Sequence, residues 1–411
     1  MFTENEIVKI VQNNDIQKLE DIISQPHDHK LLIRSTYSTN SMGRSSYIQP
    51  LIPDQNLTLL HIAAIYDSLE CYILLLKVEG LNTRTQSAAF YLPFHYACFN
   101  SSYEVAMFTL HIDPTIAMFE PGGTQYPYMY LTVVGGDPRI LEALFHCKGN
   151  DKSIKVRDDV ISKCISCRSV ECLRILLEHG ESKKDQFGDT SMPMKAIINN
   201  QPEALRLLVH SPADINFINR QGESVFSLAC FYGMNFKGVI LDMLRLMGNN
   251  TIEPPSNILC KGVCHWACQL GDLDVARAMF SKPGLLINRL DNQGNPGIFQ
   301  LIDKYSNQAE TQNAIDLMKL LIEKGFDINI RAPKVNDVYK TESILEKFTT
   351  SIKPNVKIVE FLISNGADIN AYKKGQNRRL IDVIRQSRNK QMKEIFLNKE
   401  KDLEEQAKNQ K

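Results

Sequence analysis

The sequence predicts an all-α solenoid of stacked helix-turn-helix units joined by hairpin loops. The first observation is a motif that appears at Thr58–Ala64 and again at Pro93–Cys98, with its histidine 34 residues further along the chain. Related sequences follow at Ser227–Cys230 and His265–Cys268. The second observation is a set of short apolar stripes of helical periodicity between the motifs. Recurrence at an interval of roughly 20 to 50 residues is typical of units that bury their apolar faces only against neighbouring units.

The apolar stripes predict the second helix of each unit, and glycines after them predict where that helix ends. A left-handed residue at a helix end has no steric penalty when it is glycine. The chain then turns into a hairpin at a repeated Asp-Ile-Asn sequence. The stripes are Leu173–Leu177, Leu205–Val209, Leu317–Leu321 and Val359–Ile363, the glycines are Gly180, Gly325 and Gly366, and the hairpin sequences are Ala213–Asn216, Phe326–Asn329 and Ala367–Asn370.

Together these motifs resemble the ankyrin repeat. The consensus of that family has Thr-Pro-Leu-His, then two small residues and a glycine six positions after the histidine, which Gly233 and Gly271 match. The family's Gly-Ala-Asp-Ile-Asn follows the second helix. The resemblance covers most of residues 57 to 386 and implies about nine to eleven units of roughly 33 residues. The repeats are rich in asparagine, lysine and isoleucine and are similar to those of large ankyrin families in protozoan parasites.

Several units depart from the pattern. Tyr126–Met129 and Met192–Met194 lack the histidine, residues 158–172 show little of a first helix, and residues 238–262 and 303–313 interrupt the period. We expect four segments along the chain. They are an N-terminal capping helix pair at 1–33, a polar mobile loop at 34–56, the repeat array at 57–398 and a charged, frayed tail at 399–411.

Charge and composition limit the classes of partner that the protein is expected to bind. Lysine plus arginine equals aspartate plus glutamate, 47 against 47, so no basic excess favours binding to nucleic acid. We find neither a secretory signal at the N-terminus nor an apolar run of about 18 residues, and so expect no membrane insertion. The ten cysteines are therefore expected to be reduced thiols. These observations favour a monomeric cytoplasmic protein.

The cysteines also suggest an alternative function, a redox-responsive or metal-binding regulator. Cys260, Cys264 and Cys268 are spaced four residues apart around His265, and Cys164 and Cys167 lie near Cys172. However, a structural zinc site needs four ligands at matching spacing, which the sequence does not supply. Three cysteines, at Cys98, Cys230 and Cys268, follow an alanine at the same point of the repeat, where small side chains pack between helices. We therefore favour packing and predict neither cofactor nor metal.

No sequence motif indicates an enzyme. His61, His95 and His265 recur at the histidine position of the repeat, where the resemblance implies that the imidazole joins backbone groups of adjacent units. Nucleophile-elbow, zinc-protease and phosphate-loop motifs are absent from the sequence. We therefore predict a non-catalytic scaffold that binds a protein partner.

The resemblance also implies where that partner binds. In ankyrin stacks the concave groove is lined by the two residues after the small pair and by the hairpin tips. Aromatic residues are frequent there in this chain, as they are in interface hot spots. The candidate contacts are Tyr66, Phe99, Asn100, Phe231, Tyr232 and Gln269 on first helices, and Phe187, Arg220, Arg289 and Asn292 in hairpins.

The repeat prediction can be tested at Leu208. A buried leucine contributes roughly 1.5–3 kcal/mol, and repeats depend on contacts with their neighbours. We expect Leu208→Asp to split thermal unfolding, followed by circular dichroism, into two transitions. A single transition at the parent temperature would show that the repeat assignment at this position is wrong.

Overall fold

The computed structural model consists of short helices in two compact units, Met1–Phe187 and Gly188–Lys411. Within the described residues there is no β-strand, and isolated bridges are the sole β-type pairing. The all-α prediction is therefore confirmed. The structure describes residues 3–24, 57–119, 127–148, 159–179, 190–210, 215, 217–250, 252, 260–302, 304, 308–331, 342–351, 354–373 and 378–409.

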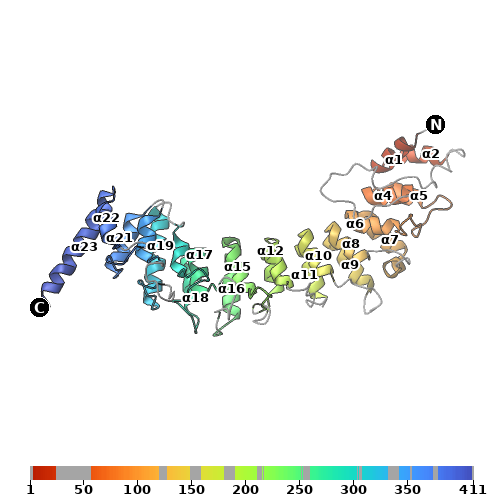
Figure 1. Cartoon of the computed structure of the whole chain (residues 1–411). Coiled ribbons are helices and arrows are strands. Elements are labelled where there is room, and N and C mark those ends of the chain that lie inside the picture. Colours follow the sequence, from red (N-terminus) through yellow and green to blue (C-terminus); the bar gives the residue numbers. More distant parts are fainter. Residues whose placement is uncertain are drawn as a thin grey trace. The chain divides into compact units, whose positions relative to one another are not determined.

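Unit 1 is a row of helix pairs. The first helix of each pair packs against the first helix of the next pair, and the second helices pack in the same order, as the α4, α6 and α8 series shows (Figure 1). The elements are α1 (Glu4–Gln12), α2 (Ile16–Ile23), α4 (Leu59–Tyr66), α5 (Leu69–Leu75), α6 (Pro93–Asn100), α7 (Tyr103–Ile112), η2 (Pro114–Met118), α8 (Tyr128–Gly135), α9 (Pro138–Lys148), α10 (Val160–Cys167) and α11 (Val170–Glu178).

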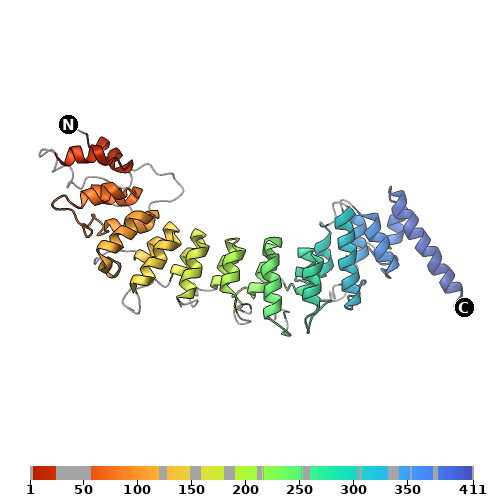
Figure 2. The ribbon, with the colours of Figure 1, turned by 180° about the vertical axis from the view of Figure 1, so that it is seen from behind.

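Unit 2 repeats this arrangement of helix pairs (Figure 2). The 3-10 helix η4 takes the place of one first helix. Isolated bridges close hairpins at Ile218 with Ser224, Leu290 with Pro296, and Tyr372 with Arg379. The elements are α12 (Met192–Ile198), α13 (Pro202–Leu208), α15 (Val225–Tyr232), η3 (Met234–Phe236), α16 (Lys237–Leu246), α17 (Val263–Leu270), α18 (Leu273–Phe280), η4 (Gly297–Leu301), α19 (Gln308–Glu323), α20 (Ile344–Thr350), α21 (Val356–Ser364), α22 (Leu380–Arg385) and α23 (Lys390–Asn409).

The first helices form because they are buried almost completely. Helices of eight residues are too short to be stable alone in water, so packing must supply their stability. In α4, every residue except Tyr66 is buried, and Ala63 and Ala64 have no exposed surface. The second helices are amphipathic instead. In α11, for example, Cys172, Leu173 and Leu176 are buried while Glu171 and Arg174 are exposed.

Small residues allow adjacent first helices to approach closely. Cys98, Cys230 and Cys268, each following an alanine, have no exposed surface, which confirms the packing interpretation of these three cysteines. One close approach is at Gly135 in α8. A Cβ added there would lie 2.6 Å from the Cys98 carbonyl oxygen, closer than real Cβ atoms come to another heavy atom. A larger residue at Gly135 would therefore push α8 away from α6.

Histidines join consecutive repeats, as expected, at two of the three positions. His61 Nδ1 accepts a hydrogen bond from the Thr58 backbone N–H (3.1 Å), and its Nε2 lies 3.2 Å from the carbonyl oxygen of Tyr91 in the next repeat. His265 Nε2 lies 3.0 Å from the Asn295 carbonyl oxygen in the same way. His95 accepts from the Leu92 N–H (2.9 Å), and its buried Nε2 has no hydrogen-bond partner among the described residues.

Asparagine side chains join the hairpins of unit 2. Asn288 Nδ2 donates to the Gly325 carbonyl oxygen (3.1 Å), and its Oδ1 accepts from the Asp327 N–H (2.8 Å). Asn329 makes the same pair of bonds one repeat later, to the Gly366 carbonyl (2.9 Å) and the Asp368 N–H (2.9 Å). These asparagines belong to the Asp-Ile-Asn sequence or its equivalent, so the turn motif is also a joint between repeats.

Two sequence expectations differ from the structure. Residues 158–172, which show little of a first helix in sequence, contain α10, with Ile161, Cys164 and Ile165 buried. The other difference concerns the C-terminal segment. The boundary at 398 falls inside α23, which continues to Asn409, although side chains 401–408 are all exposed. Glutamate, lysine and leucine are good helix formers, so these residues extend the helix without burial. The predicted loop at 34–56 lies outside the described residues.

The structure predicts a pH dependence of unit 1 through His95. Burial and the neighbouring His61 lower the pKa of His95 to about 3. An unfolded histidine, with a pKa of about 6.5, takes up a proton first as the pH falls. The stability contributed by neutral His95 is therefore complete above about pH 6.5 and is lost progressively as the pH falls toward the folded pKa.

We expect His95→Gln to make the fall in thermal midpoint between pH 7 and pH 4.5 shallower, as measured by circular dichroism. Glutamine at the third helical position can still accept the N-cap hydrogen bond but does not titrate. His111→Gln, which changes an exposed histidine of the same unit, is the control and should leave the slope unchanged. Parallel slopes for His95→Gln and the parent would contradict this account.

Candidate binding surface

The most exposed of the predicted contact residues on first helices are the aromatic pair at the end of α15. Phe231 is 50% exposed and Tyr232 is 42% exposed. Their rings pack edge to face, with centroids 5.8 Å apart. The rest of α15, Val225–Cys230, is buried. A buried helix therefore holds two aromatic rings at the surface.

Two exposed apolar residues extend this pair. Ile198, 51% exposed, ends α12 at the same distance from its N-cap as Phe231 is in α15, and Met234, 45% exposed, begins η3. The ends of α12 and α15 are also joined by a hydrogen bond from Asn235 Nδ2 to Asn200 Oδ1 (3.3 Å). We call Ile198, Phe231, Tyr232 and Met234 the α15 patch.

Sequence reasoning missed Ile198 and Met234. Ile198 belongs to a unit that lacks the histidine, so the motif did not place its first helix. The sequence feature that could have marked the start of this helix is Ser191. In the structure it is the N-cap, and its side chain accepts a hydrogen bond from the Met194 N–H (3.4 Å). Counting from that serine brings Ile198 into register with Phe231. Met234 lies beyond the two positions that the repeat pattern singles out.

The remaining first-helix candidates are less exposed. Gln269 borders the patch and donates from Nε2 to the Phe231 carbonyl oxygen (3.2 Å). In unit 1, Tyr66, Phe99 and Asn100 are half-buried, and Asn100 Nδ2 donates to the Tyr96 carbonyl oxygen of its own helix (2.9 Å). The structure therefore displays the aromatic candidates of unit 2 more fully than those of unit 1.

The hairpin candidates that the structure describes differ in how exposed their side chains are. Arg220 and Asn292 are exposed in turns, as expected for hairpin tips. Arg289 is half-buried, and its Nε donates to the Cys260 carbonyl oxygen (3.0 Å). Its guanidinium thus links one hairpin to the chain before the preceding first helix. Phe187 lies outside the described residues.

Unit 1 also has a surface depression that the sequence did not predict. It has a volume of about 690 Å³ and runs along the second helices α7 and α9 to Ile175 of α11. At one end, the guanidinium of Arg139 lies 3.9 Å from the centre of the Tyr103 ring and pairs with Asp137 (2.7 Å). That ion pair lowers the pKa of Asp137 against the opposing effect of burial. The depression lies in a different unit from the α15 patch.

In the part of the chain that the structure describes, the cysteines show no arrangement for metal binding. Among the described residues, no group of three or more His, Cys, Asp or Glu side chains is placed to hold a metal ion. All ten cysteines are free thiols. Burial raises the pKa of Cys98 and of Cys172 to about 12, which disfavours the reactive thiolate at neutral pH. Nothing here supports the redox or metal-binding alternative.

A family comparison agrees with the helix pairs and hairpins. Residues 129–219 match the family model described as ankyrin repeats, in three copies. The chain contains ankyrin repeats. The matched region includes the units around α8, α10 and α12, whose motifs are among the most degenerate. Ankyrin repeats are generally modules for protein–protein interaction.

Solved ankyrin proteins are similar to this chain at low sequence identity. The human ASB11 ankyrin repeat domain is 17% identical, with a TM-score of 0.36, and the similarity covers 54% of this chain and 90% of that one. An ankyrin repeat protein from Leishmania major is 14% identical, with a TM-score of 0.36, covering 64% and 95%. No curated protein sequence matches the chain. Within the described residues, no helix is both long and apolar enough to cross a membrane.

Proposed function

We propose that this protein is a non-catalytic scaffold that binds a protein partner through the ends of its first helices and its hairpin tips. The α15 patch is the observation that carries this proposal. Solvated helix ends seldom hold two aromatic and two aliphatic side chains together, and each of the four is at least 42% exposed. Contiguous exposed apolar side chains are typical of interaction sites.

The patch has the physical properties of a binding hot spot. Its aromatic side chains have few rotatable bonds, so they lose little conformational entropy when a partner binds them. The helix behind them is buried and fixed, so the rings are already positioned before the partner arrives. The amide groups of Gln269 and Asn235 lie beside the apolar residues, and polar groups at the edge of an apolar centre are typical of interfaces.

The proposal predicts that a variant with both Phe231→Ala and Tyr232→Ala loses a protein partner. The parent and variant chains are compared as baits in a lysate of the source cells, and the recovered protein is then purified and titrated against both. Removing two hot-spot aromatics should weaken binding on the order of 30-fold or more. The fold should be unaffected because both rings are half in solvent, and circular dichroism checks this.

Leu246→Ala with Leu286→Ala is the matched control, because both leucines are exposed (41% and 56%) in the same unit but outside the patch. It should bind as the parent does. A second variant, Tyr66→Ala with Phe99→Ala, tests the half-buried candidates of unit 1. Equal affinity of the parent and the Phe231/Tyr232 variant for every recovered protein would refute the proposed site.

A further inference from the structure

Three five-residue turns in the chain share one hydrogen-bond pattern. They are Ser87–Tyr91, Asn219–Glu223 and Asp291–Asn295, and each directly precedes the N-cap of a first helix. The first residue donates its N–H to the carbonyl of the fifth (2.9–3.0 Å), and the fourth donates to the carbonyl of the first (2.9–3.1 Å). A side-chain oxygen of the first residue accepts from the fifth N–H in all three (3.2, 2.8 and 2.8 Å).

The fourth residue of these turns has a left-handed backbone. It is glycine in two of them, Gly222 with φ 73° and Gly294 with φ 80°, but it is Phe90 with φ 64° in the first. A bulky residue with positive φ is a genuine outlier, because its Cβ approaches the following carbonyl oxygen. Burial does not compensate for this strain, since Phe90 is 47% exposed.

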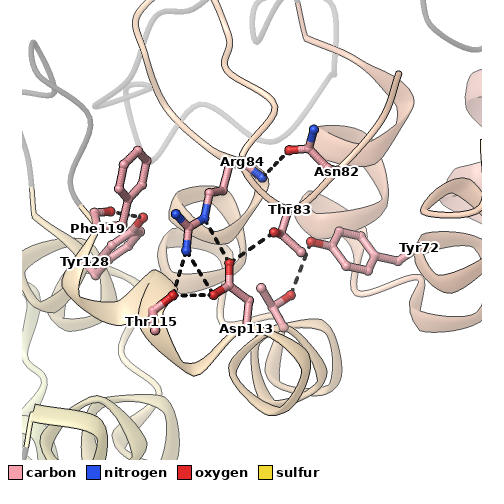
Figure 3. A network of polar contacts seen from close by, with 9 residues as sticks. Tyr72, Asn82, Thr83, Arg84, Asp113, Thr115, Phe119 and Tyr128 are labelled. Carbon is pink, nitrogen blue, oxygen red and sulfur yellow. Dashed lines mark hydrogen bonds and ion pairs between the residues drawn. The ribbon is translucent and has the colours of Figure 1, made fainter. Parts of the chain in front are cut away.

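The surrounding structure imposes the turn on Phe90. At the end of the turn, His61 of the preceding repeat lies 3.2 Å from the Tyr91 carbonyl oxygen. Before it, Arg84 donates from Nε and Nη2 to the two carboxylate oxygens of Asp113 (both 3.0 Å) (Figure 3). Arg84 also lies 4.7 Å from the centre of the Phe119 ring. Hydrogen bonding to Arg84 lowers the pKa of Asp113, so the Arg84–Asp113 ion pair remains charged at neutral pH.

We propose that Phe90 is a partner-binding residue, displayed at the turn before α6 so that its ring enters an apolar pocket of a protein partner. Strained residues persist where function requires them, and aromatic residues dominate interface hot spots. The turn itself favours an uncharged apolar partner surface. Ser87–Tyr91 contains no charged side chain, whereas the equivalent turns contain Arg220, Glu223 and Asp291. This inference rests on the proposed function as a protein-binding scaffold and adds a contact in unit 1.

The strain is tested first, without any partner. The equilibrium constant for unfolding should be about three- to fivefold smaller for Phe90→Gly than for Phe90→Ala, because glycine removes the left-handed penalty and alanine retains it. Urea unfolding of the full chain, followed by circular dichroism, measures this ratio. Gly222→Phe is the matched control and should destabilise the chain by placing the same strain in an equivalent turn. A Phe90→Gly chain less stable than Phe90→Ala would mean that the backbone at this position is not strained, which overturns the proposal.

Binding is tested with proteins recovered from the source-cell lysate by the parent chain. Each is purified and titrated against the parent, Phe90→Gly and the Phe231/Tyr232 double variant. The expected result is at least one protein bound on the order of 30-fold more weakly by Phe90→Gly. Equal affinity of the parent and Phe90→Gly for every recovered protein overturns the role of Phe90, even if the double variant loses binding. Loss with Phe90→Gly alone supports Phe90 and places the α15 patch outside the interface.

Phosphatidylcholine–phosphatidylserine vesicles distinguish a lipid surface from a protein. The proposal expects that the parent and Phe90→Gly sediment equally with such vesicles. Vesicle binding by the parent that Phe90→Gly abolishes would mean that the ring inserts into lipid, and would overturn the assignment to a protein pocket. Recovery of no protein at all by the parent chain would overturn both this proposal and the proposed function.

Discussion

The close approach of consecutive first helices is the constraint on which the rest of each unit depends. The backbones come so near at Gly135 and Cys98 that only a small residue fits. This spacing determines which backbone groups of the next repeat a side chain can reach. The imidazole of His61, for example, reaches the Tyr91 carbonyl oxygen of the following repeat because α4 and α6 are packed together. In α15 the same packing leaves the last two residues, Phe231 and Tyr232, at the surface.

Much of this architecture could be predicted from sequence because the packing constraint selects particular residues. Small pairs such as Ala229-Cys230 and histidines at a fixed phase are visible without a structure. The helix α10 was not visible, because its core consists of Ile161, Cys164 and Ile165, which fill the same volume without the family motif. The extension of α23 to Asn409 was missed for another reason: it depends on helix propensity, and no burial pattern marks it.

The candidate site was less predictable than the fold, because exposure depends on neighbours that the sequence does not position. The repeat pattern places Phe99 and Phe231 equivalently, yet Phe99 is half-buried and Phe231 is half in solvent. Arg289, expected at the binding surface, is held by the Cys260 carbonyl oxygen, a contact between residues 29 positions apart. Phe90 could not be recognised as unusual until the structure showed that its turn matches two turns with glycine at that position.

In unit 2, the asparagine side chains that connect adjacent hairpins make the same contacts although the repeats are longer than usual. Asn288, Asn329 and Asn370 are 41 residues apart, well above the usual repeat of about 33. Nevertheless, Asn288 and Asn329 make the same two bonds to the backbone that follows. Residues inserted between joints, as in the 16-residue helix α19, therefore leave the coupling unchanged. In evolution, such a joint lets a repeat gain or lose loop sequence while neighbouring modules remain correctly docked.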